Sequence, residues 1–352
     1  MTGVATIALR PDYSISRVIR GGWQLAGGHG PIDRSNAIDD LIAAFDAGIT
    51  TFDCADIYTG VEDLYGDFLA RLRDERGEAA AAHVKVHTKL VPDLAVLPHI
   101  ARADVKRIVD ASLRRLRMQT LDLVQFHWWD YGEPRWLDAL GWLEELRLQG
   151  KIRHVGGTNF DTAHVSTILA AGIPLLTMQV QYSLLDHRPQ SGLAQLCQQH
   201  SVALLCYGSV AGGFLSDRWL GASEPTNALE NRSLTKYKPI IDDFGGWSLF
   251  QELLATLRAI ADRHATDIAT IASRYTLEQP GVGAVIVGAL TRAHLAANVA
   301  ISNIALDAAD YTAIAAVVDR REGPTGEVYG LERDRESRHG SIMKYNLNAK
   351  AS

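Results

Sequence analysis

The chain has 352 residues, of which 47% are hydrophobic and 22% charged, and its formal net charge is −6. This apolar fraction lies in the ordinary globular range, so the sequence predicts a large core and excludes a wholly disordered chain. A mildly acidic chain without a clustered basic face is not expected to bind nucleic acid. The length permits either two ordinary domains or one α/β barrel with extensions.

The first residues, MTGVATIALRPDYS, contain neither the basic region nor the apolar run of a signal peptide. No apolar stretch in the sequence approaches the 18 residues typical of a membrane-spanning helix. Cys54, Cys197 and Cys206 form no CxxC pair, and this sparse, odd set predicts reduced thiols. We therefore expect a cytoplasmic protein without a membrane partner.

Short β-like runs alternate with longer amphipathic stretches along the chain. A hairpin is expected near residues 6–20, and a first barrel strand near 17–23. A helix follows over 35–48, which Ser35 is expected to cap and Gly48 to end. Further strands are expected over 49–54, 84–89, 120–127, 152–158, 175–181, 202–208 and 282–288, with helical patterns between them.

This alternation predicts a (β/α)8 TIM barrel. Successive strands end at Asp53, Lys89, His127 and Thr158, at spacings of 36, 38 and 31 residues, about the length of one βα unit. Regular βα alternation requires a parallel sheet, and eight units favour a closed barrel. A doubly wound sheet is expected to carry GxGxxG after its first strand, whereas the chain has GGWQLAGGHG there.

We predict a single domain over residues 1–352, with the barrel at about 17–318. The residues beyond an ordinary barrel are expected in an N-terminal β-hairpin, a long loop at 208–248 and a C-terminal extension at 319–352. This charged tail is expected to lie over or beside the barrel. Its sequence does not identify a substrate.

Polar residues mark the ends of the early strands. Asp53, Lys89 and His127 each end a strand, and Tyr58 follows Asp53 by five residues. Period-two alternation along VKVHTK and LDLVQFH allows Lys89 and His127 to point inward. Because barrel active sites lie at the carboxyl ends of the strands, these four side chains are expected to meet.

Six stretches carry a resemblance to a known family. TFDCADIY, VHTKL, SLRRLRMQTLDLVQFH, GKIRHVGGTNF, MQVQYS and CYGSVAGGFL occur in this order, and with them the chain resembles the aldo-keto reductase superfamily over about residues 15–320. The resemblance implies a (β/α)8 barrel and a catalytic tetrad of Asp53, Tyr58, Lys89 and His127. It also implies an NAD(P)(H)-dependent oxidoreductase that transfers a hydride between nicotinamide and the carbonyl or alcohol of a small molecule, such as an aldehyde, a ketone or a sugar.

The chemistry explains why these residue types are needed. Carbonyl reduction requires a hydride donor and an acid at the oxygen where negative charge develops. Tyr58 is expected to be this acid, and to act as the base in the oxidative direction. A phenol has a pKa of about 10, and the Lys89 ammonium is expected to lower the pKa of Tyr58. Asp53 is expected to keep Lys89 charged, and His127 to donate a hydrogen bond to the substrate oxygen.

The resemblance further implies a site for a nicotinamide dinucleotide. Thr158, Asn159 and Gln179 match residues that hold the carboxamide, and Tyr207 matches the aromatic ring under the nicotinamide. The full set of expected cofactor contacts is Gly22, Trp23, Asp53, Thr158, Asn159, Gln179, Tyr207, Gly208, Ser209, Gly212, Gly288, Ala289, Leu290, Arg292, His294 and Asn298.

The loop after residues 282–288 departs from the family pattern. Many relatives place a lysine or arginine there against the 2′-phosphate of NADP, but this chain has Gly288, Ala289 and Leu290, and later His294. Only Arg292 is a nearby cation. NADP(H) is the expected cofactor, and NAD(H) stays an alternative.

Aromatic walls are expected around the substrate, because they suit a moderately apolar carbonyl compound and exclude water. Trp247 is expected to act as a lid, and at least one of Trp128 and Trp129 must point away, since neighbouring side chains diverge. The expected pocket residues are Trp23, Tyr58, His127, Trp128 and Trp247.

Two other classes of function are alternatives to a reductase. A non-catalytic, cofactor-binding regulatory subunit of the same fold is the main alternative, and the intact tetrad argues against it. A metal-dependent barrel hydrolase would need a ligand pair such as His-x-His at the first strand, whereas His29 stands alone. No metal is therefore expected. The sequence does not determine whether the protein is a monomer or a homo-oligomer.

Overall fold

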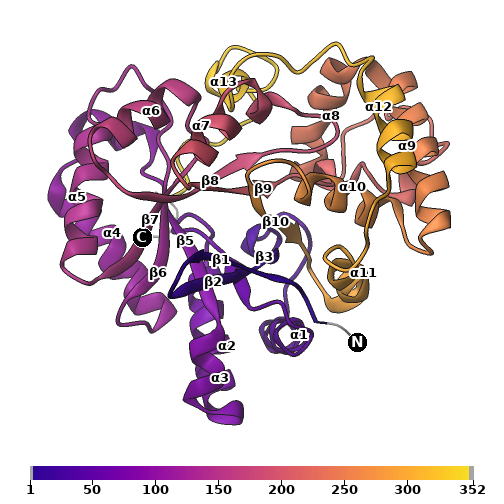
Figure 1. Cartoon of the computed structure of the whole chain (residues 1–352). Coiled ribbons are helices and arrows are strands. Elements are labelled where there is room, and N and C mark those ends of the chain that lie inside the picture. The colour runs from indigo at the N-terminus through magenta and orange to yellow at the C-terminus, as the bar shows by residue number, and fades with distance from the viewer. Residues whose placement is uncertain (1–2, 349–352) are drawn as a thin grey trace.

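The computed structural model describes residues 3–348 and contains a closed barrel of eight parallel strands (Figure 1). Neighbouring strands follow the order β10-β3-β4-β5-β6-β7-β8-β9, which confirms the predicted (β/α)8 fold. The barrel strands are β3 (Val18–Gly21), β4 (Thr51–Asp53), β5 (Lys85–Leu90), β6 (Leu121–Phe126), β7 (Ile152–Thr158), β8 (Leu175–Gln181), β9 (Ala203–Tyr207) and β10 (Val282–Gly288).

Helices surround the barrel (Figure 1). They are α1 (Arg34–Asp46), α2 (Val61–Arg76), α3 (Glu78–His83), α4 (Arg102–Leu116), α5 (Trp136–Leu148), α6 (Thr162–Ala170), α7 (Leu193–Gln199), α8 (Arg232–Phe244), α9 (Gly246–Arg263), α10 (Ile268–Leu277), α11 (Leu295–Ala300), α12 (Ala308–Val318) and α13 (Gly330–Arg333). The prediction that Ser35 caps the N-terminus of α1 is wrong. The capping residue is Asp33, whose carboxylate accepts from the N–H of Asn36.

The expectation of one long loop at 208–248 is also wrong, because this segment contains α8. Leu234, Tyr237 and Ile241 recur at helical spacing and are buried, so α8 turns an apolar face toward the molecule.

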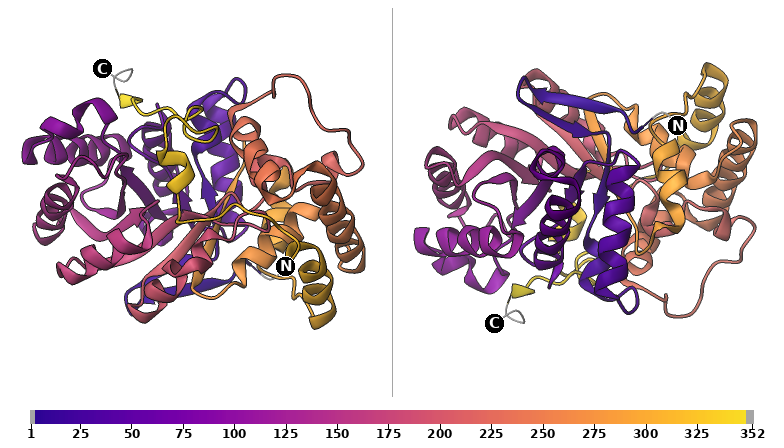
Figure 2. Two further views of the ribbon diagram at one scale, coloured as in Figure 1. Left: turned by 90° about the horizontal axis from the view of Figure 1, so that it is seen from above. Right: turned by 90° about the horizontal axis from the view of Figure 1, so that it is seen from below.

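The N-terminal hairpin closes one end of the barrel. Strands β1 (Thr6–Arg10) and β2 (Tyr13–Ser16) pair antiparallel, and they lie in front of the barrel when the molecule is seen from below (Figure 2). Tyr13 is fully buried, packs in one cluster with Leu123, and its hydroxyl lies 3.1 Å from Nε2 of His87. Side chains therefore fill this end, and the opposite end is left for a site.

The C-terminal extension crosses the other end of the barrel. Seen from above, residues after α12 run over the carboxyl ends of the strands (Figure 2). The carbonyl of Tyr345 accepts from the N–H of Leu94 (2.9 Å), and Nδ2 of Asn348 donates to the carbonyl of Val91 (2.9 Å). These bonds tie the extension to the loop after β5, so the tail lies over the barrel.

Three observations bear on the expected class of protein. No helix within residues 3–348 is both long and apolar enough to cross a membrane. Cys54, Cys197 and Cys206 are all buried free thiols. Across the same described range, no three His, Cys, Asp or Glu side chains are grouped as metal ligands.

Candidate active site

Asp53 and Lys89 form a buried ion pair at the carboxyl end of the barrel. The Nζ atom of Lys89 donates to Oδ1 of Asp53 (2.5 Å) and to the carbonyl of Cys54 (2.8 Å). The two side chains are only 6% and 4% exposed. Burial alone disfavours the charged amine, but the Asp53 carboxylate more than offsets this and raises the pKa of Lys89 to about 12. Lys89 is therefore an ammonium at neutral pH.

The second carboxylate oxygen of Asp53 is also occupied. Oδ2 accepts from Nε2 of Gln179 (2.7 Å) and from Nε2 of Gln125 (3.1 Å). With both oxygens engaged by protein donors, Asp53 positions Lys89, and this argues against its expected second role as a cofactor contact. Gln125 was absent from the predicted site. Its alternation with His127 along β6 is the signal that places it inside the barrel.

Tyr58 lies between β4 and α2, beside the charged lysine. Its ring centroid is 5.0 Å from Nζ of Lys89 and 5.2 Å from the ring of Trp23. Burial raises the pKa of Tyr58, and the nearby Lys89 ammonium only partly opposes this. Lys89 therefore acts in the predicted direction, but burial outweighs it, so the pKa of Tyr58 stays above its ordinary value and the phenol is protonated at neutral pH.

His127 follows β6 and is buried against the tail. Its Nδ1 lies 3.1 Å from the carbonyl of Thr158, and because a carbonyl can only accept, Nδ1 carries the proton. Burial, together with the charge of Arg333, lowers the pKa of His127 to about 3. The neutral ring therefore presents a bare Nε2, which is buried and has no hydrogen-bond partner within residues 3–348. The expectation that His127 donates to the substrate oxygen is wrong for this tautomer, since Nε2 accepts.

Asn159 and Gln179 leave a donor and an acceptor for a ligand. The hydroxyl of Tyr207 donates to Oδ1 of Asn159 (2.8 Å), which leaves Nδ2 of Asn159 as a donor. Gln179 uses its Nε2 on Asp53, which leaves its Oε1 as an acceptor. A donor and an acceptor side by side match a primary carboxamide, so these residues fit the nicotinamide group. The hydroxyl of Thr158 donates to the carbonyl of Gln179 (3.2 Å) instead.

The glycines after β9 allow α8 to pack closely. A Cβ at Gly208 would lie 2.2 Å from the hydroxyl of Tyr237. A Cβ at Gly212 would lie 2.8 Å from the carbonyl of Ser233. Ser209 is buried, and its hydroxyl lies 3.0 Å from that of Ser273. Packing against α8 therefore explains Gly208 and Gly212, and Ser209 contacts α10; the sequence predicted all three as cofactor contacts.

Arg292, the residue expected to contact the 2′-phosphate of NADP, follows β10 and forms an ion pair with Asp40. Nε of Arg292 lies 3.3 Å from Oδ1 of Asp40, and the Arg292 side chain is 65% exposed. A Cβ at Gly288 would overlap the side-chain amide of Gln24, 1.9 Å away. Gln24 therefore contacts Gly288, and sequence reasoning missed this contact.

The remaining expected cofactor residues vary in exposure. Ala289 is buried, Leu290 and Asn298 are half-buried, and His294 is exposed. Gly22 donates its N–H to the carbonyl of Asp53 (2.7 Å) and thereby joins two strand ends.

The two adjacent tryptophans after β6 diverge as expected. Trp128 is fully buried, its Nε1 donates to the carbonyl of Asp130 (2.8 Å), and its ring packs on Phe126, which points away from the barrel interior. Its assignment to the substrate pocket is therefore wrong. Trp129 takes that place, with its ring 4.3 Å from the ring of His127.

Trp247 is not a lid over the tetrad. It lies in α9, not in a loop, and packs against Phe214, Trp219 and Phe250. Its Nε1 donates to the carbonyl of Ala222 (3.0 Å). These contacts belong to a second apolar cluster outside the barrel, so this expectation is also wrong.

The tail adds residues to the mouth that sequence reasoning missed. Arg333 donates to the carbonyls of Asn159 (2.9 Å) and Trp128 (3.0 Å), and its guanidinium lies 4.1 Å from the ring of Tyr131. The ring of Tyr329 lies 5.5 Å from that of His127. No local sequence signal predicts these contacts, because they depend on where the tail docks.

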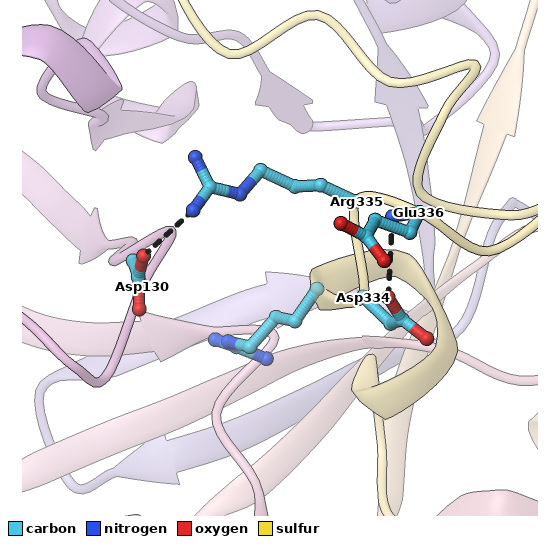
Figure 3. Close-up of a pocket in the computed structure, with 5 residues that line it drawn as sticks. Asp130, Asp334, Arg335 and Glu336 are labelled. Atoms are coloured by element: carbon cyan, nitrogen blue, oxygen red, sulfur yellow. Dashed lines mark hydrogen bonds and ion pairs between the residues drawn. The ribbon is translucent and has the colours of Figure 1, made fainter.

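Beside these contacts the tail lines a cavity of about 530 Å³ (Figure 3). Asp130, Asp334, Arg335 and Glu336 line it, and the Arg335 side chain reaches across to Asp130, with its guanidinium 3.4 Å from the carboxylate. The tail therefore forms part of the wall around the barrel mouth.

A closed (β/α)8 barrel with this set of groups at the carboxyl ends of its strands is the arrangement of an oxidoreductase that uses a nicotinamide cofactor. A sequence model of the Aldo/keto reductase family matches residues 17–319. The chain belongs to the aldo/keto reductase family.

Known proteins similar to this chain agree with that family. The chain is 27% identical over 323 residues to the NADH-specific methylglyoxal reductase of Escherichia coli strain K12. The alignment covers 86% of this chain and 94% of that protein. A glycerol dehydrogenase of Gluconobacter oxydans has a similar structure, with a TM-score of 0.74, 24% identity, and coverage of 91% of this chain and 97% of that one. An aldo/keto reductase of Klebsiella pneumoniae, solved with NADP and acetate, has a TM-score of 0.66, 22% identity, and coverage of 89% and 94%. These structural likenesses establish the fold.

Proposed function

We propose that the protein is an NAD(P)(H)-dependent reductase or dehydrogenase that acts on the carbonyl or alcohol of a small aldehyde, ketone or sugar. The observation that carries this proposal is the protonated Tyr58 phenol beside a Lys89 ammonium held by Asp53. Family membership supports it. The similarity to a methylglyoxal reductase supports a small carbonyl substrate.

The side chains divide the work at the reacting carbonyl. A bound nicotinamide supplies or accepts the hydride, and Asn159 and Gln179 would hold its carboxamide. Tyr58 gives its proton to the carbonyl oxygen as negative charge develops there. Lys89 stabilises the phenolate that remains. Nε2 of His127 accepts a hydrogen bond from the hydroxyl of the alcohol.

For the cofactor, we propose NADP(H) first and NAD(H) as the alternative. Both are consistent with similar proteins, since one is NADH-specific and another was solved with NADP. The Asp40 partner of Arg292 reduces the attraction of this loop for a 2′-phosphate. Comparing kcat/KM for NADPH and NADH decides between them.

Three further points belong to the same proposal. We treat residues 1–352 as one domain, because the tail packs on the barrel mouth and shares its side-chain contacts. We also place the protein in the cytoplasm and assign it no nucleic-acid partner.

The Tyr58→Phe variant tests the proposal directly. It keeps the ring and removes the proton donor, so turnover of an aldehyde is expected to fall by about 10²–10⁴-fold. NAD(P)H oxidation over a panel of aldehydes and ketones measures this loss. Tyr65→Phe is the matched control, since the Tyr65 hydroxyl donates to the backbone carbonyl of Asp53 (3.3 Å) and should be dispensable for chemistry.

Two results would count against the proposal. Near wild-type turnover by Tyr58→Phe would remove Tyr58 as the acid. Cofactor binding by the wild-type protein without turnover of any carbonyl compound would favour the non-catalytic regulatory subunit instead.

A further inference from the structure

One ammonium at the barrel mouth lies among aromatic rings without a counter-ion. Nζ of Lys236, on α8, lies 4.6 Å from the ring centroid of Tyr207, 5.2 Å from that of Tyr237 and 6.0 Å from that of Tyr329. Within the described part of the chain, Lys236 has no ion pair and no hydrogen bond. Ring faces offset only part of the loss of hydration of an ammonium.

Two cations close to Lys236 are ion-paired. Lys238, two residues along α8, lies 2.7 Å from Glu224 and 2.5 Å from Asp242. Arg188, beneath the tail, is bonded to two buried carboxylates. In a chain with a net charge of −6, carboxylates are plentiful, yet none between residues 3 and 348 forms an ion pair with Lys236.

The position of Lys236 carries a cost. Burial lowers its pKa to about 8, although the charges of Glu332 and Asp186 partly oppose this. An amine with a perturbed pKa is more often found at a functional site than on an ordinary surface. A ligand that brings negative charge to this point would offset the cost.

The ammonium faces the reacting groups. Its ring neighbour Tyr329 packs on His127, and the charge of Lys236 contributes to the low pKa of His127. A second cation, Arg333, lies 5.3 Å from the ring of Tyr329, and its Nε is buried without a hydrogen-bond partner within residues 3–348. Positive charge therefore borders the space next to Nε2 of His127 on the side of the tail.

We propose that Lys236 holds an anionic group of the substrate, a carboxylate or a phosphate ester, at the tail-facing edge of the site. The enzyme would then prefer carbonyl compounds that carry such a group over neutral ones. This inference rests on the proposed reductase activity. The diphosphate of the cofactor has the same chemistry, and the experiment separates the two sources.

Matched substrate pairs test this assignment. Succinic semialdehyde is compared with its methyl ester, and glyceraldehyde 3-phosphate with glyceraldehyde, at saturating NADPH or NADH so that effects on cofactor binding cancel. The wild-type enzyme is expected to prefer the anion of each pair. Lys236→Met is expected to lower the ratio of the two kcat/KM values by about 10-fold or more, the usual worth of a charge-assisted hydrogen bond.

Two variants control for charge and for helix packing. Lys236→Arg retains the positive charge and should keep the preference for anions. Lys238→Met removes a paired lysine from the same helix and should leave the ratio unchanged. Circular dichroism confirms that each variant is folded.

The pH dependence gives a second readout. The groups that face the ammonium are Asp186, Arg188, Glu332, Tyr207, Tyr237 and Tyr329. Burial raises the pKa of the three phenols, which therefore stay neutral near pH 8, and the Arg188 pairing lowers that of Glu332 to about 2, so Glu332 stays charged there. The preference for the anion should therefore fall as pH rises through about 8 in the wild type, and the Lys236→Met ratio should not change there.

An unchanged ratio in Lys236→Met overturns the proposal, and a weaker NADPH affinity in that variant would assign the lysine to the cofactor diphosphate. Failure of the wild type to reduce any member of the pairs would instead contradict the proposed function. In that case the dissociation constants of succinic semialdehyde and its ester, measured by tryptophan fluorescence with NADP present, test Lys236 separately. Equal binding of both compounds by the wild type also overturns the proposal.

Discussion

Replacing Asp53 by Asn removes the anion on which the site depends while it keeps the shape of the side chain. Asp53 accepts from Lys89, Gln125 and Gln179, and the Asp53 and Lys89 side chains are almost fully buried. The variant leaves a buried ammonium without its partner. Both stability and turnover should therefore fall.

The magnitude follows from the ion pair. The pKa of Lys89 rises from an ordinary 10.5 to about 12, which corresponds to about 2 kcal/mol of stability. Because the folded-state pKa is raised, this contribution is complete below about pH 10.5 and is lost as pH rises through about 12. Breaking a buried pair from one side costs more, about 3–5 kcal/mol, because the remaining charge is uncompensated. We expect Asp53→Asn to lose this amount at pH 7.

Urea unfolding and aldehyde turnover measure the two effects. Asp53→Asn should show a lower free energy of unfolding and a loss of kcat approaching that of Tyr58→Phe. The double variant Asp53→Asn/Lys89→Met also removes the unpaired charge, so it should regain stability over Asp53→Asn but remain inactive. Asp67→Asn is the control. Asp67 pairs with Arg34 and Arg117 near the surface, where the loss is about 1 kcal/mol or less.

Two outcomes would refute this reasoning. A loss below about 1 kcal/mol in Asp53→Asn would mean that the ion pair contributes no more than a surface pair. A double variant less stable than Asp53→Asn would show that packing of the lysine stem, not its unpaired charge, dominates.

Three further predictions concern other parts of the molecule. Asp40→Asn frees Arg292 from its ion pair and removes a negative charge, so the ratio of kcat/KM for NADPH to kcat/KM for NADH should rise by about 3–10-fold. An unchanged ratio would argue against Arg292 as a phosphate contact. Arg188→Met leaves the Asp186 and Glu332 carboxylates buried without their shared cation, so the free energy of unfolding in urea should fall by about 3–5 kcal/mol. Wild-type stability in this variant would contradict the pairing. Because burial raises the pKa of Tyr58, reduction of a neutral aldehyde should be nearly independent of pH from about 6 to 9, whereas alcohol oxidation should rise with pH. A fall in reduction across neutral pH would contradict a protonated phenol.

Much of the fold could be predicted from the sequence because barrel strands are regular. Continuous apolar runs such as VGAVIVG and their regular spacing predicted all eight barrel strands to within a few residues. The extra segments were predicted less well. Within residues 208–248, Pro239 interrupts the helical pattern, and α8 becomes evident only because Leu234, Tyr237 and Ile241 pack on a common apolar surface.

Within the site, strand-end position was enough to bring Asp53, Lys89, Tyr58 and His127 together. Their electrostatic states were not predictable, because the pKa of a phenol or an imidazole depends on how much water the surrounding side chains exclude. The direction of the His127 hydrogen bond likewise depends on the Thr158 carbonyl, which belongs to the next strand.

The sequence by itself determined the barrel, the family and the four polar groups at the strand ends, since these depend on local periodicity and on motifs within single βα units. Only the tertiary structure decided which tryptophans face the site and what covers its mouth. Trp129 reaches His127 while Trp128 does not, and Lys236, Tyr329 and Arg333 reach the mouth from α8 and the tail. The physical reason is that these contacts join segments up to about 200 residues apart, and their placement depends on how whole elements dock against one another.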